Sequence, residues 1–362
     1  MSNGSSGRSS SESRTEDVQA KIDSIQREFN RLEEKADLAN VQETIGRIEE
    51  RLAEYPLELS SFEQRGYVHS GKLHGRLDML NGQWRKIRPG LRSALREQQN
   101  KLKSEVRSTL RLVSQARSGR KSAISSAENA VDRLETKLGT ADRTLSSQYR
   151  NVDSELSGLG YSLKRVSWML DQLDESQEIS LRSGEGPLLA VKSEWHRDGD
   201  DGPKGVIFLT DQRLLFEQKE EVVTKRRFGI FKSESEIVHK LWLDINVKDI
   251  ESVEDSEEGG FLGIGKDDIL EIVCSGDAPV SRARFHLDGQ DSSDWRTEIK
   301  EVQTGVVASE LHEAARAEQA SQVVSFPSQC PNCMAPLPEP HRGSTYLKCE
   351  FCGTSVGPEI SG

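Results

Sequence analysis

The chain has 362 residues, of which 34% are hydrophobic and 30% are charged, and its formal net charge is −11. This composition is too polar for one large globular core and favours long helices combined with small domains, while the length predicts two or three domains. No run of about 18 or more apolar residues is present, and no charged segment followed by an apolar stretch opens the chain, so we expect neither a membrane-spanning helix nor a signal peptide.

The first half of the chain has the pattern of long amphipathic helices. Residues 1–14 are rich in Ser and Gly, which predicts a disordered tail. From residue 15 to about 180, apolar residues recur at alternating steps of four and three, as at Val18, Ile22, Ile25 and Phe29, which is the seam of a coiled coil. A helix with one narrow apolar stripe is not stable by itself and needs a partner that covers the stripe. These segments therefore fold back on each other as a hairpin or bundle, or pair with another copy, and we expect both.

Interruptions of the seam predict where the helical region is divided. The seam slips near Leu38 and then resumes. Residues that end or kink helices stand at four later places: Pro56, Pro89, Ser118-Gly119 and Gly139. We therefore expect a stalk of several segments and not one continuous rod.

Charge is distributed unevenly along the helical half. Residues 16–63 hold 13 acidic and 6 basic residues, whereas residues 85–121 hold 12 basic and 2 acidic residues. This contrast favours antiparallel packing of the second helix against the first, which would leave the basic run as a solvated, paired face. A basic helical face can instead attract nucleic acid or an anionic membrane surface. The run lacks the interleaved aromatic side chains on which single-stranded bases stack.

After residue 186 the period changes from heptads to short β-like runs separated by turn-rich segments. We predict seven strands followed by a helix that begins near Ser292 and carries Trp295 on its apolar face. Together they predict a small barrel or curled sandwich that is capped at an open end. The predicted strands are 188–195, 205–209, 213–218, 237–245, 250–253, 268–274 and 283–287.

Residues 205–217, Gly-Val-Ile-Phe-Leu-Thr-Asp-Gln-Arg-Leu-Leu-Phe-Glu, resemble the strand–turn–strand unit of GRAM and other PH-like domains. Residues 249–253 followed by a glycine-rich loop and a strand are similar to the same family, and Trp295 matches the tryptophan that PH-like domains pack under the barrel. The resemblance covers about residues 186–303. It implies a PH-like β-barrel with a capping helix, and a binding module for phosphoinositides or peptides that is not an enzyme.

Two glycine-containing loops of this module place apolar residues beside basic ones, as interfacial anchors do. They are candidate contacts for a membrane or partner, although the same side chains would equally pack onto the barrel or the helices. The candidate residues are Phe228, Ile230, Phe231, Phe261, Leu262 and Ile264.

Residues 260–266 satisfy the spacing GxxxxGK, but we do not interpret them as a phosphate-binding loop. Such a loop needs Ser or Thr next and a helix that follows it. Here Asp267 follows, and residues 269–273 alternate as a strand does.

The strongest motif lies after a helical linker, predicted at 304–324, in residues 327–356. Two CxxC pairs, separated by fifteen residues, are formed by Cys330, Cys333, Cys349 and Cys352. Each pair can form a tight turn, called a knuckle, that supplies two thiolates. Two knuckles supply the four thiolates of a closed tetrahedral Zn²⁺ site, and the spacing resembles the zinc-ribbon family. A rubredoxin-like iron is the alternative metal. The fifth cysteine, Cys274, lies in a strand-like run and is expected to be a buried thiol.

These features predict a multidomain α+β protein: a helical coiled coil or hairpin (15–180), a PH-like domain (186–303) and a zinc ribbon with structural Zn²⁺. We expect a non-catalytic, cytoplasmic scaffold or adaptor that self-associates, binds proteins and contacts an anionic membrane surface. The alternative is a nucleic-acid-associated factor of transcription or translation that uses the basic helix 85–121 and the ribbon. We find no catalytic constellation, so no enzyme activity is expected.

Overall fold

The computed structural model describes residues 6–197, 202–225, 234–259, 266–276, 278–309, 327–338 and 347–356. The described chain combines long α-helices with antiparallel sheet. It divides into two compact units, Met1–Arg296 and Thr297–Gly362, which are described separately. Among the described residues, no helix is long and apolar enough to cross a membrane.

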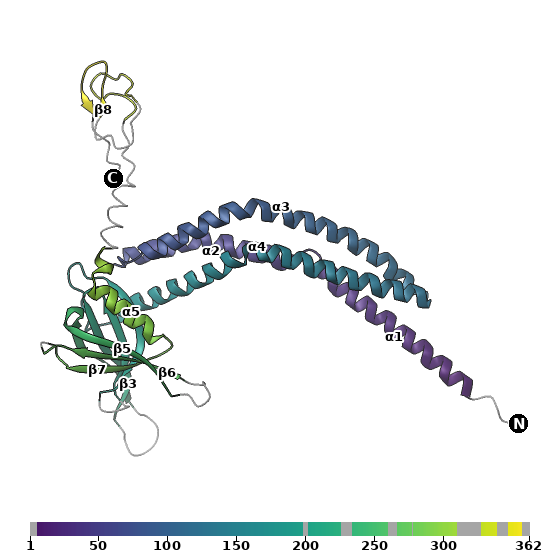
Figure 1. The fold of residues 1–362 in the computed structure, drawn as a ribbon, viewed down its shortest axis with the longest axis horizontal. Coiled ribbons are helices and arrows are strands. Elements are labelled where there is room, and N and C mark those ends of the chain that lie inside the picture. The colour runs from purple at the N-terminus through teal and green to yellow at the C-terminus, as the bar shows by residue number, and fades with distance from the viewer. Residues whose placement is uncertain are drawn as a thin grey trace. The chain divides into compact units, whose positions relative to one another are not determined.

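Four helices form the first half of the chain: α1 (Ser6–Lys35), α2 (Ala39–Gln64), α3 (Gly71–Ala116) and α4 (Lys121–Glu175). Helix α1 begins inside the segment that the sequence predicts to be a disordered tail. Helices α1 and α2 run in the direction of α4, and α3 lies antiparallel to them (Figure 1). Ion pairs fix this register: Lys21 contacts Glu128 in α4, and Arg92 in α3 contacts Glu49 in α2. The helices therefore fold back on each other within one chain, as predicted, while self-association stays a prediction.

Only some of the predicted helix breaks are correct. Leu38 adopts a left-handed conformation with φ of 54° between α1 and α2, where the seam slips, and Gly119 does so with φ of 73° between α3 and α4. The divisions predicted at Pro56, Pro89 and Gly139 are wrong, because all three residues lie inside helices. A proline removes one backbone hydrogen bond. The packing of the apolar seam on both sides outweighs that loss here.

The seam residues form the core of the bundle. Fully buried side chains from all four helices meet along its axis, each contributing about 1.5–3 kcal/mol by leaving water. They include Phe29, Ile48, Leu59, Leu80, Leu91, Leu134 and Leu145.

The β domain is a seven-stranded antiparallel sheet with the order β4-β3-β2-β1-β7-β6-β5. Each predicted strand lies within an observed one. Because β4 and β5 are the two edges and do not pair with each other, the sheet is curled and not closed into a barrel. The strands are β1 (Pro187–Trp195), β2 (Lys204–Thr210), β3 (Arg213–Lys225), β4 (Glu234–Asn246), β5 (Ile250–Gly259), β6 (Lys266–Cys274) and β7 (Arg282–Leu287).

Aromatic side chains fill the inside of the curled sheet. The ring of Phe216 lies 6.1 Å from that of Trp195 and 5.5 Å from that of Phe285. Helix α5 (Ser292–Gln303) begins at the predicted residue, and its Trp295 is completely buried. Cys274 is also buried in β6, as expected. The sequence predicts a small barrel or curled sandwich with one capping helix. The capping helix is confirmed, while the closed barrel is wrong because the sheet has two open edges, β4 and β5.

The bundle and the sheet share one apolar core. Ala190, Val206, Phe208 and Leu215 from β1, β2 and β3 belong to the same buried cluster as the helical seam. These side chains alternate in sequence with those that face the inside of the sheet. The outer face of the first three strands is therefore covered by the helical half, which accounts for strands that are buried on both faces, such as β2.

The cysteine-containing segment is a small unit with its own core. Strands β8 (Leu347–Lys348) and β9 (Ser355–Val356) pair as a short antiparallel ladder. Cys330, Cys349 and Val356 are buried together, with Ala335 and Leu337 packed against them. A core this small cannot fold a domain by itself, so an additional source of stability is required. The predicted helical linker lies mostly in residues 310–326, outside the described residues.

Candidate metal centre and the junction between bundle and β domain

The two CxxC pairs converge on one point. The Sγ atoms of Cys330, Cys333, Cys349 and Cys352 all lie within 4.8 Å of one another. Sγ of Cys330 is 3.6 Å from that of Cys352, and Sγ of Cys333 is 3.6 Å from that of Cys349. Among the described residues, no other group of three or more His, Cys, Asp or Glu side chains is placed to hold a metal ion.

The two knuckles have the same backbone geometry. The N–H of Met334 donates to the carbonyl of Cys330 at 2.8 Å, and the N–H of Gly353 donates to the carbonyl of Cys349 at 2.9 Å. A second hydrogen bond closes each knuckle. The N–H of its first cysteine donates to the carbonyl five residues later, which belongs to Ala335 in the first knuckle and to Thr354 in the second. This repeat turns both cysteine side chains of a knuckle in the same direction, so the four sulfurs meet.

The cysteine cluster fits a tetrahedral metal. Four thiolates at about 2.3 Å from a Zn²⁺ ion are separated by about 3.8 Å from each other. Two of the observed separations are 3.6 Å, and all four sulfurs lie within 4.8 Å of one another. Hydrogen bonds with Thr354 lower the pKa of Cys352, whereas the pKa of Cys333 is raised, because the neighbouring thiols outweigh the lowering effect of a backbone hydrogen bond at Ala335. The metal-free cluster therefore holds protons that a bound cation would displace. The donor set therefore suits a closed site with sulfur ligands only.

Met334 occupies a strained position in the first knuckle. Its φ is 61°, and the equivalent residue of the second knuckle is Gly353 with φ of 73°. A residue with a side chain is less stable in this conformation than glycine by about 1–2 kcal/mol. Part of glycine's advantage is lost, because glycine has more conformational freedom in the unfolded chain. Met334 is 67% exposed, so its side chain contributes little burial.

Met334→Gly is therefore expected to stabilise the folded, metal-loaded segment by about 1 kcal/mol. The measurement is the rate of zinc loss to a chromogenic chelator, which should fall several-fold. Met334→Ala retains the strain and serves as the control. Equal rates for the glycine and alanine variants would contradict the strain argument.

The predicted membrane or partner loops cannot be placed. Residues 228–231 and 261–264 lie outside the described residues. The rejected phosphate-loop motif is followed by β6 and not by a helix, as predicted. His341 also lies outside the described residues.

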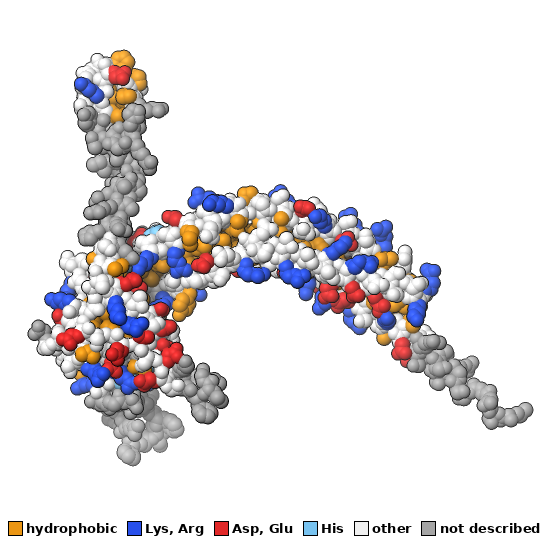
Figure 2. All heavy atoms as spheres, viewed as in Figure 1, with side chains coloured by type: hydrophobic (Ala, Val, Ile, Leu, Met, Phe, Trp, Pro, Cys, Tyr) orange, Lys and Arg blue, Asp and Glu red, His pale blue; other side chains and the backbone are white. Residues whose placement is uncertain are grey.

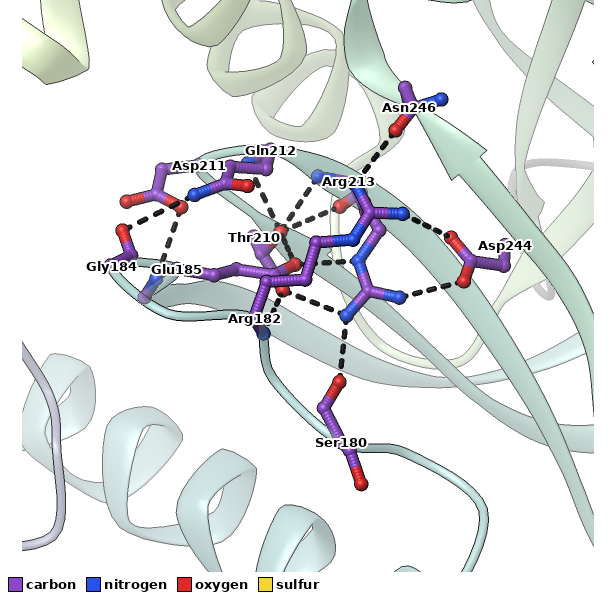
Figure 3. A network of polar contacts seen from close by, with 11 residues as sticks. Ser180, Arg182, Gly184, Glu185, Thr210, Asp211, Gln212, Arg213, Asp244 and Asn246 are labelled. Carbon is purple, nitrogen blue, oxygen red and sulfur yellow. Dashed lines mark hydrogen bonds and ion pairs between the residues drawn. The ribbon is translucent and has the colours of Figure 1, made fainter.

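A buried network of charges, which the sequence pattern did not predict, joins the end of the helical half to the β2–β3 turn (Figure 3). The guanidinium of Arg213 binds the carboxylate of Glu185 through two hydrogen bonds of 2.9 and 2.7 Å and donates to Asp244 at 2.7 Å. The Thr210 hydroxyl donates to Glu185 at 2.6 Å. The side chains of Glu185 and Arg213 are 0% and 6% exposed, so this ion pair is withdrawn from water.

The protonation of Glu185 is set by these partners. Burial of the carboxylate raises its pKa, but hydrogen bonds from Arg213, the Arg182 N–H and Thr210 outweigh burial and hold the pKa of Glu185 below its ordinary value. The same pairing raises the pKa of Arg213. Both groups are therefore charged at neutral pH.

The loop between α2 and α3 reaches the same turn. His69 Nε2 lies 3.3 Å from Asp211 Oδ2, and Asp211 Oδ1 accepts the N–H of Gly186 at 3.0 Å. A Cβ atom at Gly186 would lie 2.4 Å from Val68 Cγ2. A larger residue at position 186 would therefore have to displace the side chain of Val68.

Gln290 ties three elements together at the other side of the junction. Its side-chain amide donates to the carbonyl of Ala190 in β1 at 2.9 Å, and its oxygen accepts from Arg165 of α4 at 2.7 Å and from Trp295 Nε1 at 2.9 Å. One side chain thus positions the bundle, the sheet and the tryptophan of the capping helix.

Gln290→Ala is expected to lower the free energy of unfolding of the β domain by about 1–3 kcal/mol, because it leaves the donors of the buried Trp295 and the half-buried Arg165 without their acceptor. Urea unfolding followed by tryptophan fluorescence measures the effect. Gln177→Ala, at an exposed position before β1, is the matched control and should change stability by less than about 0.5 kcal/mol. A Gln290 variant as stable as the control would contradict the assigned role.

A cavity of about 610 Å³ opens between α4 and the first three strands. Its wall combines one tryptophan with charged side chains of both signs, and two of these form the ion pair Lys219–Glu175 across the junction. This size is in the range of ligand-binding clefts. The lining residues include Trp168, Gln172, Glu175, Lys192, Lys204 and Lys219.

Comparison with protein-family models and with curated proteins finds no match. Among solved structures, the chain is similar to the N-terminal PH domain of Vps36, with 18% identity over 37% of this chain and 90% of that chain and a TM-score of 0.24. It is also similar to the N-terminally truncated linker-DH/PH domains of p115-RhoGEF, with 12% identity over 80% of this chain and 98% of that chain and a TM-score of 0.23. These low scores carry no argument about function. The β domain itself is a seven-stranded antiparallel sheet with one capping helix and a buried Trp295.

Proposed function

We propose that the protein is a non-catalytic adaptor, in which the helical bundle and the PH-like β domain form one binding platform and a structural zinc ribbon provides a second module. The observation that carries this proposal is the junction. A buried ion pair, the close approach of Gly186 to Val68 and the Gln290 amide hold the β domain against the helical half. Such a junction suits the presentation of binding surfaces in a fixed arrangement.

The metal centre supports a structural role. Four cysteine sulfurs fill a tetrahedral shell, so no position is left for a substrate or an activated water. Zinc held by thiolates requires a reducing compartment, which favours the cytoplasm. In this proposal the metal stabilises the fold of the ribbon, and the ribbon binds a protein partner through its surface.

The junction cavity is the candidate partner site of the platform. Trp168 offers an apolar surface, while Lys192 and Lys204 offer charge at the rim. Tryptophan is enriched among the residues that dominate binding energy at protein interfaces. A peptide or protein loop inserted here would contact both the bundle and the sheet.

Crosslinking of the full chain in its host cells tests the proposal. An adaptor should lose one set of crosslinked partners in Trp168→Ala and a different set in the double variant Cys330→Ser, Cys349→Ser. Leu57→Ala, at a residue of α2 that is 71% exposed, is the control for a neutral surface change. If both test variants keep every partner of the unaltered chain, the adaptor proposal is wrong.

A further inference from the structure

Five basic residues of α3 lie along one face of the helix. The spacings between them are seven, four, seven and four residues, close to whole helical turns, so their side chains project from one face over about 33 Å. All five are exposed. This set, called the basic stripe, consists of Arg85, Arg92, Arg96, Lys103 and Arg107.

The bundle leaves most of the basic stripe without a counter-charge. The acidic first helices neutralise it at one point, where Glu49 binds Arg92 at 2.8 Å. Arg96, Lys103 and Arg107 have no ion-pair or hydrogen-bond partner among the described residues. The expectation that the basic run is paired with the acidic helix is therefore met only around Glu49.

The two acidic residues of this part of α3 do not neutralise the stripe either. Glu97 pairs with Lys101 at 2.6 Å, and Glu105 pairs with Lys137 of α4. Lys and Arg side chains are visible along the bundle in Figure 2. The stripe therefore remains a cationic line on a folded, rigid support.

We propose that the basic stripe of α3 is a docking surface for an anionic lipid bilayer. Anionic lipids attract basic side chains that are clustered on one face of a helix, and each such base near the surface contributes about 1 kcal/mol to binding. No aromatic residue lies between Trp84 and Tyr149 on which a single strand could stack. Leu110, 42% exposed, follows Arg107 in the same line and adds an apolar contact that suits a bilayer.

Vesicle co-sedimentation of the full chain tests this proposal, with vesicles of phosphatidylcholine and phosphatidylglycerol that contain no phosphoinositide. Binding should require the anionic lipid and weaken as salt is raised. Each neutralised base should weaken binding about fivefold. The triple variant Arg96→Gln, Lys103→Gln, Arg107→Gln should therefore bind on the order of 100-fold more weakly.

The control variant Arg133→Gln, Arg143→Gln, Arg150→Gln removes the same charge from exposed positions of α4 and should bind within about threefold of the unaltered chain. Circular dichroism checks that both variants remain helical. Three results would overturn the proposal: no binding to anionic vesicles, equal losses in the two triple variants, or a stripe-dependent binding of duplex DNA without vesicle binding. None of them bears on the partner crosslinking described above.

Discussion

Replacing Arg213 with Met is expected to destabilise the β domain by about 3–5 kcal/mol, because the carboxylate of Glu185 would remain buried without its counter-charge. The Glu185 side chain is 0% exposed, so water cannot replace the guanidinium. The Asp244 carboxylate and the Ser180 carbonyl would lose the same partner. Because the pair holds the end of the helical half against the β2–β3 turn, the junction should loosen as well.

Hydrogen exchange resolves this effect better than a global melt, because a chain of several domains does not unfold in two states. In Arg213→Met, the exchange rates of amides in β2 and β3 should rise by the factor that corresponds to the lost free energy of unfolding. The exchange rates of amides in the core of the bundle should rise less. Arg282→Met is the matched control. Arg282 pairs with Glu271 at the surface and is 67% exposed, so its loss should cost less than about 1 kcal/mol. Equal exchange in the two variants would refute the importance of the buried pair.

The same network predicts how stability depends on pH. Because the pKa of Glu185 is lower in the folded protein than its ordinary value of 4.5, its ionisation stabilises the fold at every pH above that value. This contribution should be lost as the pH falls from 4.5 through the lowered folded pKa. In Glu185→Gln the acid-induced loss of β-domain stability should be shallower, which a pH series of urea midpoints measures.

Removing the metal is expected to unfold the cysteine-containing segment and leave the rest of the chain folded. The segment buries only a few side chains, so the free energy of metal binding supplies most of its folding energy. After treatment with a strong chelator, amides of residues 347–356 should exchange at the rate of an unfolded chain. The bundle and the β domain, which share one large apolar core, should keep their protection.

Native mass spectrometry identifies the ligands. Cys330→Ser and Cys349→Ser should each abolish retention of the metal, since both side chains are buried in the cluster. Cys274→Ala is the control, because this thiol lies in β6 and its loss should leave the metal content unchanged. A chain that is purified without metal, or a Cys330 variant that retains it, would disprove the assignment. The measured mass also separates zinc from the iron alternative.

The sequence predicted well those elements that are determined by residues close together in the chain. The strands follow from alternating apolar residues between turn-forming segments, and the capping helix begins at Ser292 as expected. The four cysteines were recognisable from spacing alone, because a knuckle is a local turn whose geometry does not depend on distant residues. Trp295 was also predicted to face the core, and it is completely buried.

The predictions that failed are those in which local preference competed with packing. Pro56 and Pro89 end helices in isolated chains, but here the apolar seam continues across both positions and holds one helix together. The predicted breaks that did occur, at Leu38 and Gly119, coincide with a shift or an end of that seam, whereas the break between Gln64 and Gly71 was not predicted. The continuity of the core, and not the helix propensity of one residue, decided where each helix ends.

The amino-acid sequence by itself determined the kinds of unit in this protein: helices with a single apolar stripe, a curled antiparallel sheet with one helix, and a four-thiolate cluster. Each follows from side chains that are near neighbours in the chain. The tertiary structure alone decided how the bundle and the sheet meet. His69, Arg165, Glu185, Arg213 and Gln290 come from separate segments and share no spacing. Their contacts therefore form only when apolar burial brings the outer face of β1–β3 onto the helical half and withdraws the Glu185–Arg213 pair from water.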